Sequence, residues 1–541
     1  MKRANADLRD CTALVIDANP VSRSALINVL RSMGFADVSQ TSRVVDARQE
    51  LESRVFDVVV CDYHFDNDSI NGQELLDDLR QAKLLPFATV FIMVTAECSY
   101  LKVAEAAESA LDSYLVKPHL PAALEERILT ARHRKRSLGH VFAAIQAGEL
   151  AKAAKLCQAR YLAREDFWLY AARIGAELFL QIGDHKSAKE LYQRAHESTP
   201  VSWTRLGLAR AELAAGSVSK ATRILDELLA EDPEYADAHD VMGQVHLEQG
   251  HLDLALVSYR TALRITPQSI PRLQKHGLLS FFSGNRDDAM NDLDRTVRLG
   301  LKSKMFDLQS LVLLCMVYFD KKDSKEFKRA LANLNMLVQK KPESVRLQRF
   351  MRICEVLLAL LERKVDECVR AAENLGREIT AETLDYEGAV NLLAMLVRLR
   401  RAAVPLPQAE QWIKDLSQRF CVSKVSCEIL CVAADGDKDY GALIHEGHHV
   451  ISSMAEQAMN HSVSGEPTIA VESLLQGGAQ TGNAKLIEMA GAVLSRHSAH
   501  IADCDNLSTT VSELKARYCT QGSQLGLGQS QRSAGGLKLR A

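Results

Sequence analysis

The sequence has no apolar run long enough to span a membrane. Its longest such run, Leu311–Phe319, falls well short of the roughly 20 apolar residues that a membrane-spanning helix requires. Residues 1–7 lead into Leu8, Arg9 and Asp10 rather than into an apolar segment, so no secretory signal is expected. We therefore expect a soluble protein with no segment inserted in a membrane.

Paired cysteines and an excess of one charge are also missing. The 12 cysteines are scattered and lie mostly within apolar segments, as expected for reduced thiols in the cytoplasm. The 541-residue chain carries 66 basic and 69 acidic residues, and its net charge of −3 gives no overall attraction to nucleic acid or anionic membranes. The length allows several domains of about 100–200 residues each.

One basic segment, Arg132–Arg136, is an exception to this balance. It could contact nucleic acid, but cations at the end of a helix more often complement the negative end of the helix dipole and stay solvated. No helix-turn-helix pattern follows the segment, so nucleic acid is not expected among the partners.

Residues 8–137 alternate between short apolar runs and amphipathic segments. The runs are continuously apolar, as in strands buried on both faces of a sheet, and the segments between them have helical periodicity. This alternation predicts an α/β domain with a parallel sheet covered by helices. The clearest strand-like runs are Ala13–Ile16, Val58–Val60, Val90–Val94 and Tyr114–Val116.

A polar residue follows each of these runs, at Asp17, Asp62, Thr95 and Lys117. Ligands of parallel sheets bind beyond the carboxyl ends of the strands, so the four side chains are expected at one edge. Two carboxylates there can share a hard divalent cation, while a hydroxyl and an ammonium contact a bound phosphoryl group. Each residue alone has an ordinary explanation as a turn or cap residue. Together they predict a phosphoryl-accepting carboxylate at Asp62.

The region resembles the receiver domain of two-component response regulators. The resemblance implies a doubly wound, five-stranded parallel sheet of the flavodoxin-like type. It also implies a role in phosphorelay signalling rather than catalysis of a metabolic reaction. The motifs that carry it are Leu14–Pro20 (LVIDANP), Cys61–His64 (CDYH), Val94–Ala96 (VTA) and Val116–Pro118 (VKP).

The resemblance assigns roles to four of these residues. Asp62 is the phosphoacceptor, which takes a phosphoryl group from a histidine kinase or phosphotransfer protein. Thr95 binds the phosphoryl oxygen and Lys117 pairs with it. Tyr114 is an aromatic switch that turns inward on activation, although a lone tyrosine at such a position is more often a core residue than a switch.

A magnesium ion (Mg2+) is the implied cofactor, held by Asp17, Asp62 and the main-chain carbonyl of His64. Receivers usually have two adjacent acidic residues after the first strand, and here the second is Ala18. Because magnesium often uses only one or two protein carboxylates, the site can still bind it with lower affinity. The alternative is a pseudo-receiver adaptor that signals without phosphorylation. Acidic residues of the following loop offer a replacement ligand, and these are Asp66 and Asp68.

From about residue 138 to residue 300 the periodicity becomes helical and repeats every 33 or 34 residues. This period resembles that of the tetratricopeptide repeat, in which a glycine supports the turn between two helices and small residues allow close packing. Gly148 and Ala153 indicate an earlier, degenerate unit. The repeated residues are Gly183, Gly216, Gly250 and Gly284, then Ala188, Ala221, Ala255 and Ala289, then Pro200, Pro233 and Pro267.

Stacked repeats form a superhelix whose concave face is lined by the first helix of each pair. A protein target is expected to bind there, although an ordinary solvated helix face explains the same residues equally well. The candidate groove residues are Tyr170, Arg173, Glu177, Trp203, Arg210, Asp240, Gln244, Gln274 and Phe281.

The rest of the chain is expected to be helical. Residues 301–402 have the character of degenerate repeats, and prolines at 405 and 407 indicate a hinge before a smaller helical segment at 409–520. Residues 521–541 are rich in glycine, serine and glutamine, which predicts a flexible tail.

One motif suggests an enzyme. His445, Glu446 and His449 have the H-E-x-x-H spacing of zinc hydrolases, in which two histidines bind the metal and the glutamate is the general base. A glycine lies inside the motif and no third ligand is evident, so exposed helix histidines are the simpler explanation. A structural zinc site is only slightly better supported than a catalytic one, because the nearby cysteines Cys421, Cys427 and Cys431 lack paired C-x-x-C spacing.

Overall fold

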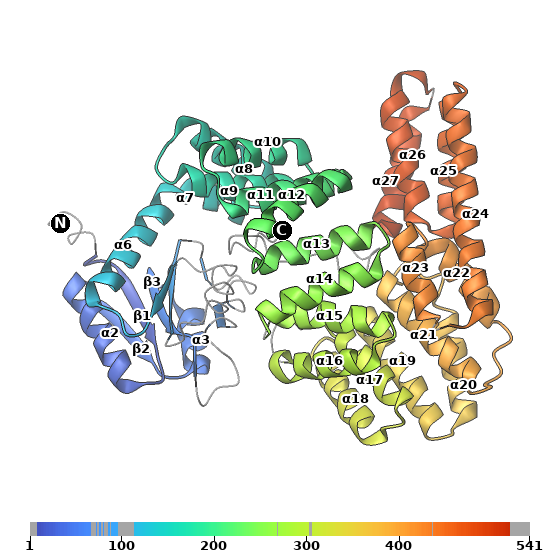
Figure 1. Ribbon diagram of the computed structural model, residues 1–541, viewed down its shortest axis with the longest axis horizontal. Helices are drawn as coiled ribbons and strands as arrows, with labels where there is room; N and C mark the ends of the chain where they lie inside the picture. The colour runs from blue at the N-terminus through green and yellow to red at the C-terminus, as the bar shows by residue number, and fades with distance from the viewer. Residues whose placement is uncertain are drawn as a thin grey trace.

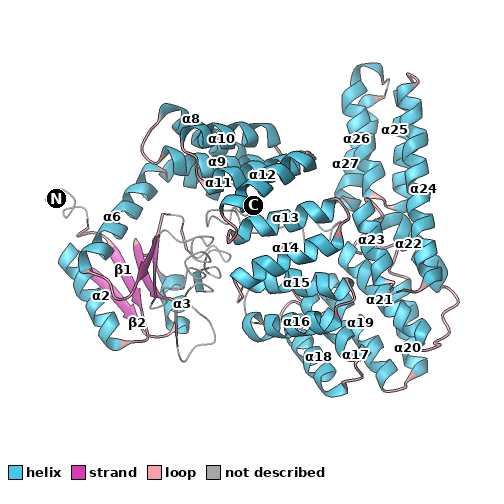
Figure 2. Ribbon diagram, viewed as in Figure 1, coloured by secondary structure: helices cyan, strands magenta, loops and turns pink. Residues whose placement is uncertain are grey.

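The computed structural model describes residues 8–65, 72, 75, 76, 79, 85, 86, 88–95, 113–267, 269–301, 306–434, 436–501 and 503–519. An α/β unit at the N-terminal end is followed by a long helical region (Figure 1), and strands occur only in the first unit within the part described (Figure 2). The loop acids Asp66 and Asp68, the tail at 521–541 and the side chain of Tyr114 lie outside the described residues.

The predicted five-stranded parallel sheet is confirmed. Its order is β2-β1-β3-β4-β5, and every neighbouring pair is parallel. Every residue of β3 and β4 is buried, which explains their continuously apolar sequences. The strands are β1 (Thr12–Ile16), β2 (Asp37–Thr41), β3 (Val58–Asp62), β4 (Val90–Thr95) and β5 (Ser113–Val116).

Separate apolar cores cover the two faces of the sheet. One contains Leu30 and Ile128 from the helices on its side, together with Val15, and the other contains Leu14 and Leu51. Alternate residues of β1 therefore enter opposite cores. The described helices of this unit are α2 (Pro20–Met33), α3 (Val44–Ser53) and α6 (Pro121–Ser137).

The repeat region consists of antiparallel helix pairs. The regular spacing of its glycines has a structural cause. Gly183, Gly216, Gly250 and Gly284 each lie in the turn inside a pair, with φ of +78° or +79°, a conformation that costs other residues energy. The helices are α7 (Gly139–Gln146), α8 (Leu150–Ala163), α9 (Trp168–Gln181), α10 (His185–Ser198), α11 (Ser202–Ala214), α12 (Val218–Glu231), α13 (Ala236–Glu248), α14 (Leu252–Ile265), α15 (Ile270–Phe282) and α16 (Arg286–Gly300).

Helix pairs continue beyond residue 300, but their turns lack glycine. Lys322 and Arg363 occupy the left-handed turn position, with φ of 56° and 62°. This replacement explains why the repeat is difficult to see in the sequence. The helices are α17 (Gln309–Asp320), α18 (Ser324–Val338), α19 (Val345–Leu361), α20 (Val365–Gly376) and α21 (Tyr386–Arg401).

One apolar cluster runs from Leu247 to Ile444, across the proline-containing segment 403–408. A second cluster, Ile451–Leu514, fills the final helices. Within the described residues, no helix is long and apolar enough to cross a membrane. The remaining helices are α22 (Ala409–Phe420), α23 (Lys424–Ala433), α24 (Lys438–Val463), α25 (Pro467–Thr481), α26 (Ala484–His497) and α27 (Cys504–Tyr518), with a short 3-10 turn η1 (Ser498–His500).

Candidate functional site

The carboxyl edge of the sheet brings the four polar strand-end residues together. Asp62 is the last residue of β3 and Thr95 the last of β4, while Asp17 and Lys117 follow β1 and β5 directly. Strand register sets Asp62 beside Val94 and Thr95 beside Val116. Because the strands are parallel and adjacent, residues distant in the sequence meet at one edge.

Lys117 joins the two carboxylates of this edge. Its Nζ atom lies 2.8 Å from Oδ2 of Asp17 and 2.8 Å from Oδ2 of Asp62. The side chain of Asp17 is fully buried, that of Asp62 is 13% exposed and that of Lys117 is 22% exposed. A buried carboxylate pair is therefore neutralised in part by one ammonium that still reaches solvent.

Asp17 is held in place by its own loop. Its Oδ1 accepts a hydrogen bond from the backbone N–H of Asn19 at 2.8 Å, and its Oδ2 accepts one from the hydroxyl of Ser22 at 2.6 Å. The guanidinium of Arg23 donates to the main-chain carbonyl of Asp17 at 2.6 Å. Sequence reasoning missed these contacts, although Asn19-Pro20 is a recognisable helix start.

The charges of the site shift each other's protonation. Burial raises the pKa of Asp62, and the hydrogen bond from Lys117 offsets only part of that shift. Burial alone lowers the pKa of Lys117, but its hydrogen bonds to Asp17 and Asp62 outweigh that effect and raise it. The amine is therefore protonated at neutral pH, as electrostatic pairing with a phosphoryl group requires.

The remaining predicted residues lie around Asp62. Thr95 is 1% exposed, and its carbonyl accepts a hydrogen bond from the backbone N–H of Lys117 at 2.6 Å. The backbone N–H of His64 donates to Asp62, and the ring of His64 is exposed. For Tyr114 only the strand backbone is described, so its predicted switch role has no side-chain geometry here.

Gly72 packs closely against the main chain of Asp62 at the end of β3. A Cβ atom at this position would lie 2.2 Å from the main-chain oxygen of Asp62, so only glycine allows this close approach. Its backbone N–H donates to the carbonyl of Tyr63 at 2.9 Å. The sequence contains no pattern that predicts this contact.

The donor atoms of the edge fit a hard divalent cation. The carboxylates of Asp17 and Asp62 converge on a common point, now occupied by the Lys117 ammonium, and the main chain at His64 is adjacent. Ala18 adds no oxygen ligand beyond its main chain. The site therefore offers two carboxylates, which suits magnesium with several retained waters.

The basic segment at the end of α6 contacts the rest of the chain. The guanidinium of Arg134 lies 4.5 Å from the ring centroid of Tyr170 on α9, and His133 lies 3.3 Å from a carboxylate oxygen of Asp166. Lys135 is 5% exposed and lies over the ring of Phe142. These side chains therefore attach the sheet unit to the first repeat helices.

Several predicted groove residues form a chain of contacts between successive repeats. Arg173 lies 5.3 Å from the ring centroid of Trp203, and Arg210 lies 3.6 Å from Glu177. Burial lowers the pKa of Arg173. These pairs join α9 to α11, so the first helices of adjacent repeats are linked by polar and aromatic side chains.

The chain of contacts continues into the next repeats. Arg272 on α15 donates to Asp240 at 2.9 Å and to Asp237 at 2.7 Å, both on α13. Gln274 donates to the hydroxyl of Ser310 at 3.4 Å. Gln244 is half-buried on α13. Most of the predicted groove residues therefore have partners within the protein.

Two groove predictions need comment. Phe281 is only 2% exposed and packs edge-on against Phe282, so it belongs to the core and does not face a partner. Tyr170 is already covered by Arg134 of α6. The remaining groove residues are half-buried, which leaves part of each side chain accessible.

The H-E-x-x-H segment lies on α24, and its histidines are not grouped as a hydrolase needs. Among the described residues, His445 forms a cluster of ligand atoms with Cys427 and Cys431. Neither Glu446 nor His449 is a member of that cluster. Gly447, inside the motif, packs so closely that a Cβ atom would lie 1.9 Å from the hydroxyl of Ser417.

Both parts of the chain match known protein families. A family model for the response regulator receiver domain matches residues 13–129, and one for the tetratricopeptide repeat matches 179–245 and 212–275. Chemotaxis protein CheY-3 of Vibrio cholerae serotype O1 is 30% identical over 115 residues, which cover 21% of this chain and 86% of that protein. Chemotaxis protein CheY of Pseudomonas aeruginosa is 31% identical over 115 residues, 21% of this chain and 90% of that protein.

Solved structures of tetratricopeptide repeat proteins are also similar to part of this chain. A tetratricopeptide repeat protein from Parabacteroides merdae has 17% identity and a TM-score of 0.35, and the match covers 49% of this chain and 98% of that one. A thermophilic tetratricopeptide repeat protein from Thermus thermophilus has 22% identity and a TM-score of 0.26, covering 34% of this chain and 96% of that one.

The sheet order and the acidic edge with its lysine define a receiver-type signalling unit. The chain belongs to the response regulator receiver family, and tetratricopeptide repeats follow its receiver. Both parts of the predicted architecture, and its link to two-component signalling, are thereby confirmed.

Proposed function

We propose that this protein accepts a phosphoryl group on Asp62 and relays the signal through its repeats to another protein. The observation that carries the proposal is the position of Lys117, 2.8 Å from both Asp17 and Asp62 at the carboxyl edge of the sheet. A phosphotransfer centre needs a nucleophilic carboxylate and a fixed cation beside it.

The phosphodonor in this proposal is a histidine kinase or a phosphotransfer protein. An oxygen of Asp62 attacks the phosphorus in line, a P–O bond forms, and the P–N bond of phosphohistidine breaks to leave a neutral imidazole. Lys117 keeps its proton, moves from the carboxylate pair and neutralises charge on the phosphoryl oxygens. Thr95, the last residue of β4, donates a hydrogen bond from its hydroxyl to a phosphoryl oxygen of phosphorylated Asp62.

Asp17, Asp62 and the main-chain carbonyl of His64 are the residues that would hold magnesium. The ion supplies charge neutralisation for the phosphoryl group when bound. Oδ2 of Asp17 already accepts hydrogen bonds from Ser22 and Lys117, so this oxygen can bind the ion only if Lys117 releases it, whereas Oδ1 accepts one hydrogen bond and keeps a lone pair for the ion. Lys117 thus changes partner during activation.

Signal output in this proposal runs through α6. Arg134 and His133 connect that helix to Tyr170 and Asp166 at the start of the repeats. A change in the receiver can therefore shift the first repeat helices by altering one packed contact. The target protein binds the partly exposed inner face that includes Arg173, Trp203, Arg210, Asp240 and Gln244.

We further propose a division of the chain by function. The receiver comprises residues 8–137, the repeats 138–300 and their degenerate continuation 301–402. A helical segment at 409–520 and a tail at 521–541 complete the chain.

Labelling tests the proposal. Full-length protein incubated with magnesium and a small-molecule phosphodonor should take up phosphate, and Asp62→Asn should abolish uptake. Asp57→Asn is the matched control, because Asp57 lies just before the same strand at its opposite end, where it accepts a hydrogen bond from the backbone of Thr12. Absence of labelling at high magnesium would favour the adaptor without phosphorylation, for which Ala18 is the supporting observation.

A further inference from the structure

A cluster of two cysteines and one histidine lies far from the receiver, on α23 and α24. The ligand atoms of Cys427, Cys431 and His445 all lie within 4.8 Å of one another. The Sγ atom of Cys431 is 3.5 Å from Nε2 of His445, and the Sγ atom of Cys427 is 3.9 Å from its Nδ1. An ion binds only one of the two ring nitrogens, and in a tetrahedral zinc site neighbouring sulfur and nitrogen ligands lie about 3.5–3.8 Å apart, so the 3.5 Å contact with Nε2 already has ligand spacing.

Two helices build this arrangement. Cys427 and Cys431 are one helical turn apart, so they share one face of α23. His445 lies in the second turn of α24, which returns along that face after a short connection. The ligand spacing therefore arises from helix pairing, and no C-x-x-C pattern is needed.

The chemistry of the cluster selects a borderline soft cation. Thiolate and imidazole ligands bind zinc in preference to magnesium or calcium, which take oxygen. Cys427 is buried, Cys431 is half-buried and His445 is exposed, so the ligands lead from solvent into the protein. An ion can therefore enter from the His445 side.

A further thiol is available. Cys421 precedes α23, is fully buried, and hydrogen-bonds to Cys427. Closed structural zinc sites use four protein ligands. Cys421 contacts Cys427 but is not among the residues whose ligand atoms all lie within 4.8 Å of one another, so a bound ion must draw its thiol inward to make it the fourth ligand.

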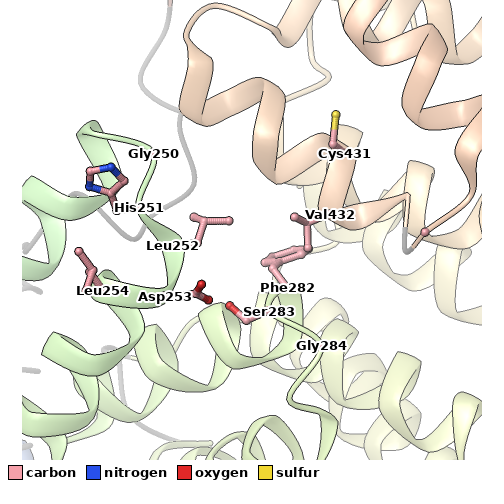
Figure 3. A pocket seen from close by; sticks show the side chains of 11 residues that line it. Gly250, His251, Leu252, Asp253, Leu254, Phe282, Ser283, Gly284, Cys431 and Val432 are labelled. Atoms are coloured by element: carbon pink, nitrogen blue, oxygen red, sulfur yellow. The ribbon is translucent and has the colours of Figure 1, made fainter.

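We propose that Cys427, Cys431 and His445, with Cys421 as the fourth ligand, form a structural zinc site that fastens α23 to α24. The site also adjoins a pocket of about 730 Å³ whose walls come from three parts of the helical region. Cys431 and Val432 of α23, Leu252 of α14 and Phe282 of α15 are among its lining residues, and Phe282 lies beside Val432 in the view (Figure 3). Zinc at the cluster fixes the position of α23 and hence one wall of this pocket.

Metal analysis tests the site in the full-length protein. Wild type purified without added zinc should carry about one zinc ion per chain. His445→Ala should lose it, and so should a double Cys427→Ser and Cys431→Ser variant. The controls are His449→Ala, one helical turn further along α24, and Cys504→Ser on α27, and both should retain zinc. Equal zinc in the His445→Ala variant would overturn the proposal.

Cobalt binding to wild type provides a test that does not depend on how the variants fold. Cobalt(II) in place of zinc should give thiolate-to-metal charge-transfer absorption and the visible bands of tetrahedral coordination. Cys421→Ser should weaken cobalt affinity, and unchanged affinity would overturn the four-ligand set. Absence of the bands, or a disulfide among these cysteines in protein purified without reductant, would overturn the site itself.

Discussion

At the scale of single residues, the proposed phosphoacceptor site depends on which groups the carboxylate of Asp17 contacts. Lys117, Ser22 and the backbone of Asn19 occupy its two oxygens, and Ala18 contributes no carboxylate. Most of the electrostatic stabilisation in this state therefore comes from one ammonium. Magnesium must compete with that ammonium, so the site should have a weaker affinity for the ion than one with two adjacent acids.

Restoring the second acid tests this explanation. Ala18→Asp adds a carboxylate beside Asp17 at a half-buried position, so the magnesium concentration for half-maximal labelling should fall on the order of tenfold. Ala18→Asn is the control, with similar size and no charge. An unchanged magnesium requirement in Ala18→Asp would show that the missing acid does not limit metal binding.

The raised pKa of Asp62 leads to a prediction about stability. Burial makes the folded state bind the Asp62 proton more tightly than the unfolded state does, so stability falls as pH rises from the ordinary value of 3.8 through the raised value. Asp62→Asn does not titrate. The variant should therefore have a higher melting temperature than wild type at pH 7, and the gain should vanish below pH 3.8.

Thermal unfolding of the two proteins at both pH values measures this difference. Carboxyl groups away from this edge are the same in wild type and variant, so the comparison reports on Asp62 together with the groups that contact it. A gain in melting temperature of equal size in acid, or a lower melting temperature than wild type at pH 7, would contradict the view that the buried Asp62 carboxylate destabilises the fold.

The sequence predicted part of this site for a clear physical reason. In a parallel sheet the strand ends share one edge, so Asp17, Asp62 and Lys117 were expected to meet, and they do. Ser22 was not predicted, because its contact depends on the local path of one loop. The cluster around His445 was also missed, because it depends on how α23 packs against α24.

At the scale of helices, turn chemistry separates the visible repeats from the degenerate ones. The visible repeats have glycine in the left-handed turn, while later pairs have Lys322 or Arg363 in the same conformation. The fold of a helix pair thus persists after its most recognisable residue has changed. The later helix pairs keep the repeat structure although their sequence no longer shows the repeat.

These left-handed turns predict opposite changes in stability for two substitutions. A left-handed conformation costs residues other than glycine roughly 1–2 kcal/mol, so Lys322→Gly should stabilise the helical region by about 1 kcal/mol. Gly216→Ala should destabilise it by a similar amount, since a Cβ atom there meets nothing within 4 Å and only the backbone conformation is affected.

Urea unfolding followed by circular dichroism measures both changes as shifts of the midpoint. Lys340→Gly is the control, because Lys340 is exposed in a turn but is not among the residues with positive φ. Stabilisation of the same size in Lys340→Gly would show that the gain in Lys322→Gly does not come from the left-handed turn.

At the scale of the whole molecule, α6 is the described connection between the receiver and the repeats. It ends the receiver and leads directly to α7 (Figure 1), and its Arg134 and His133 side chains contact Tyr170 and Asp166. The basic segment that first suggested nucleic acid is therefore engaged in contacts within the chain. A signal can pass along this route without a change in the fold of either part.

Hydrogen exchange tests this route. Phosphodonor and magnesium should change the exchange of α9 amides in wild type, and Tyr170→Ala should remove that response while labelling of Asp62 continues. His140→Ala, an exposed residue on α7, serves as the control and should respond like wild type. An undiminished response in Tyr170→Ala would place the coupling elsewhere.

The most direct test of the central claim is to locate the phosphoryl group. Protein treated with phosphodonor and magnesium is reduced with borohydride, which converts phosphoaspartate to homoserine, and its peptides are mapped by mass spectrometry. The account predicts homoserine at position 62 in wild type and none in Asp62→Asn. Homoserine at another aspartate, or none at saturating magnesium, would contradict it.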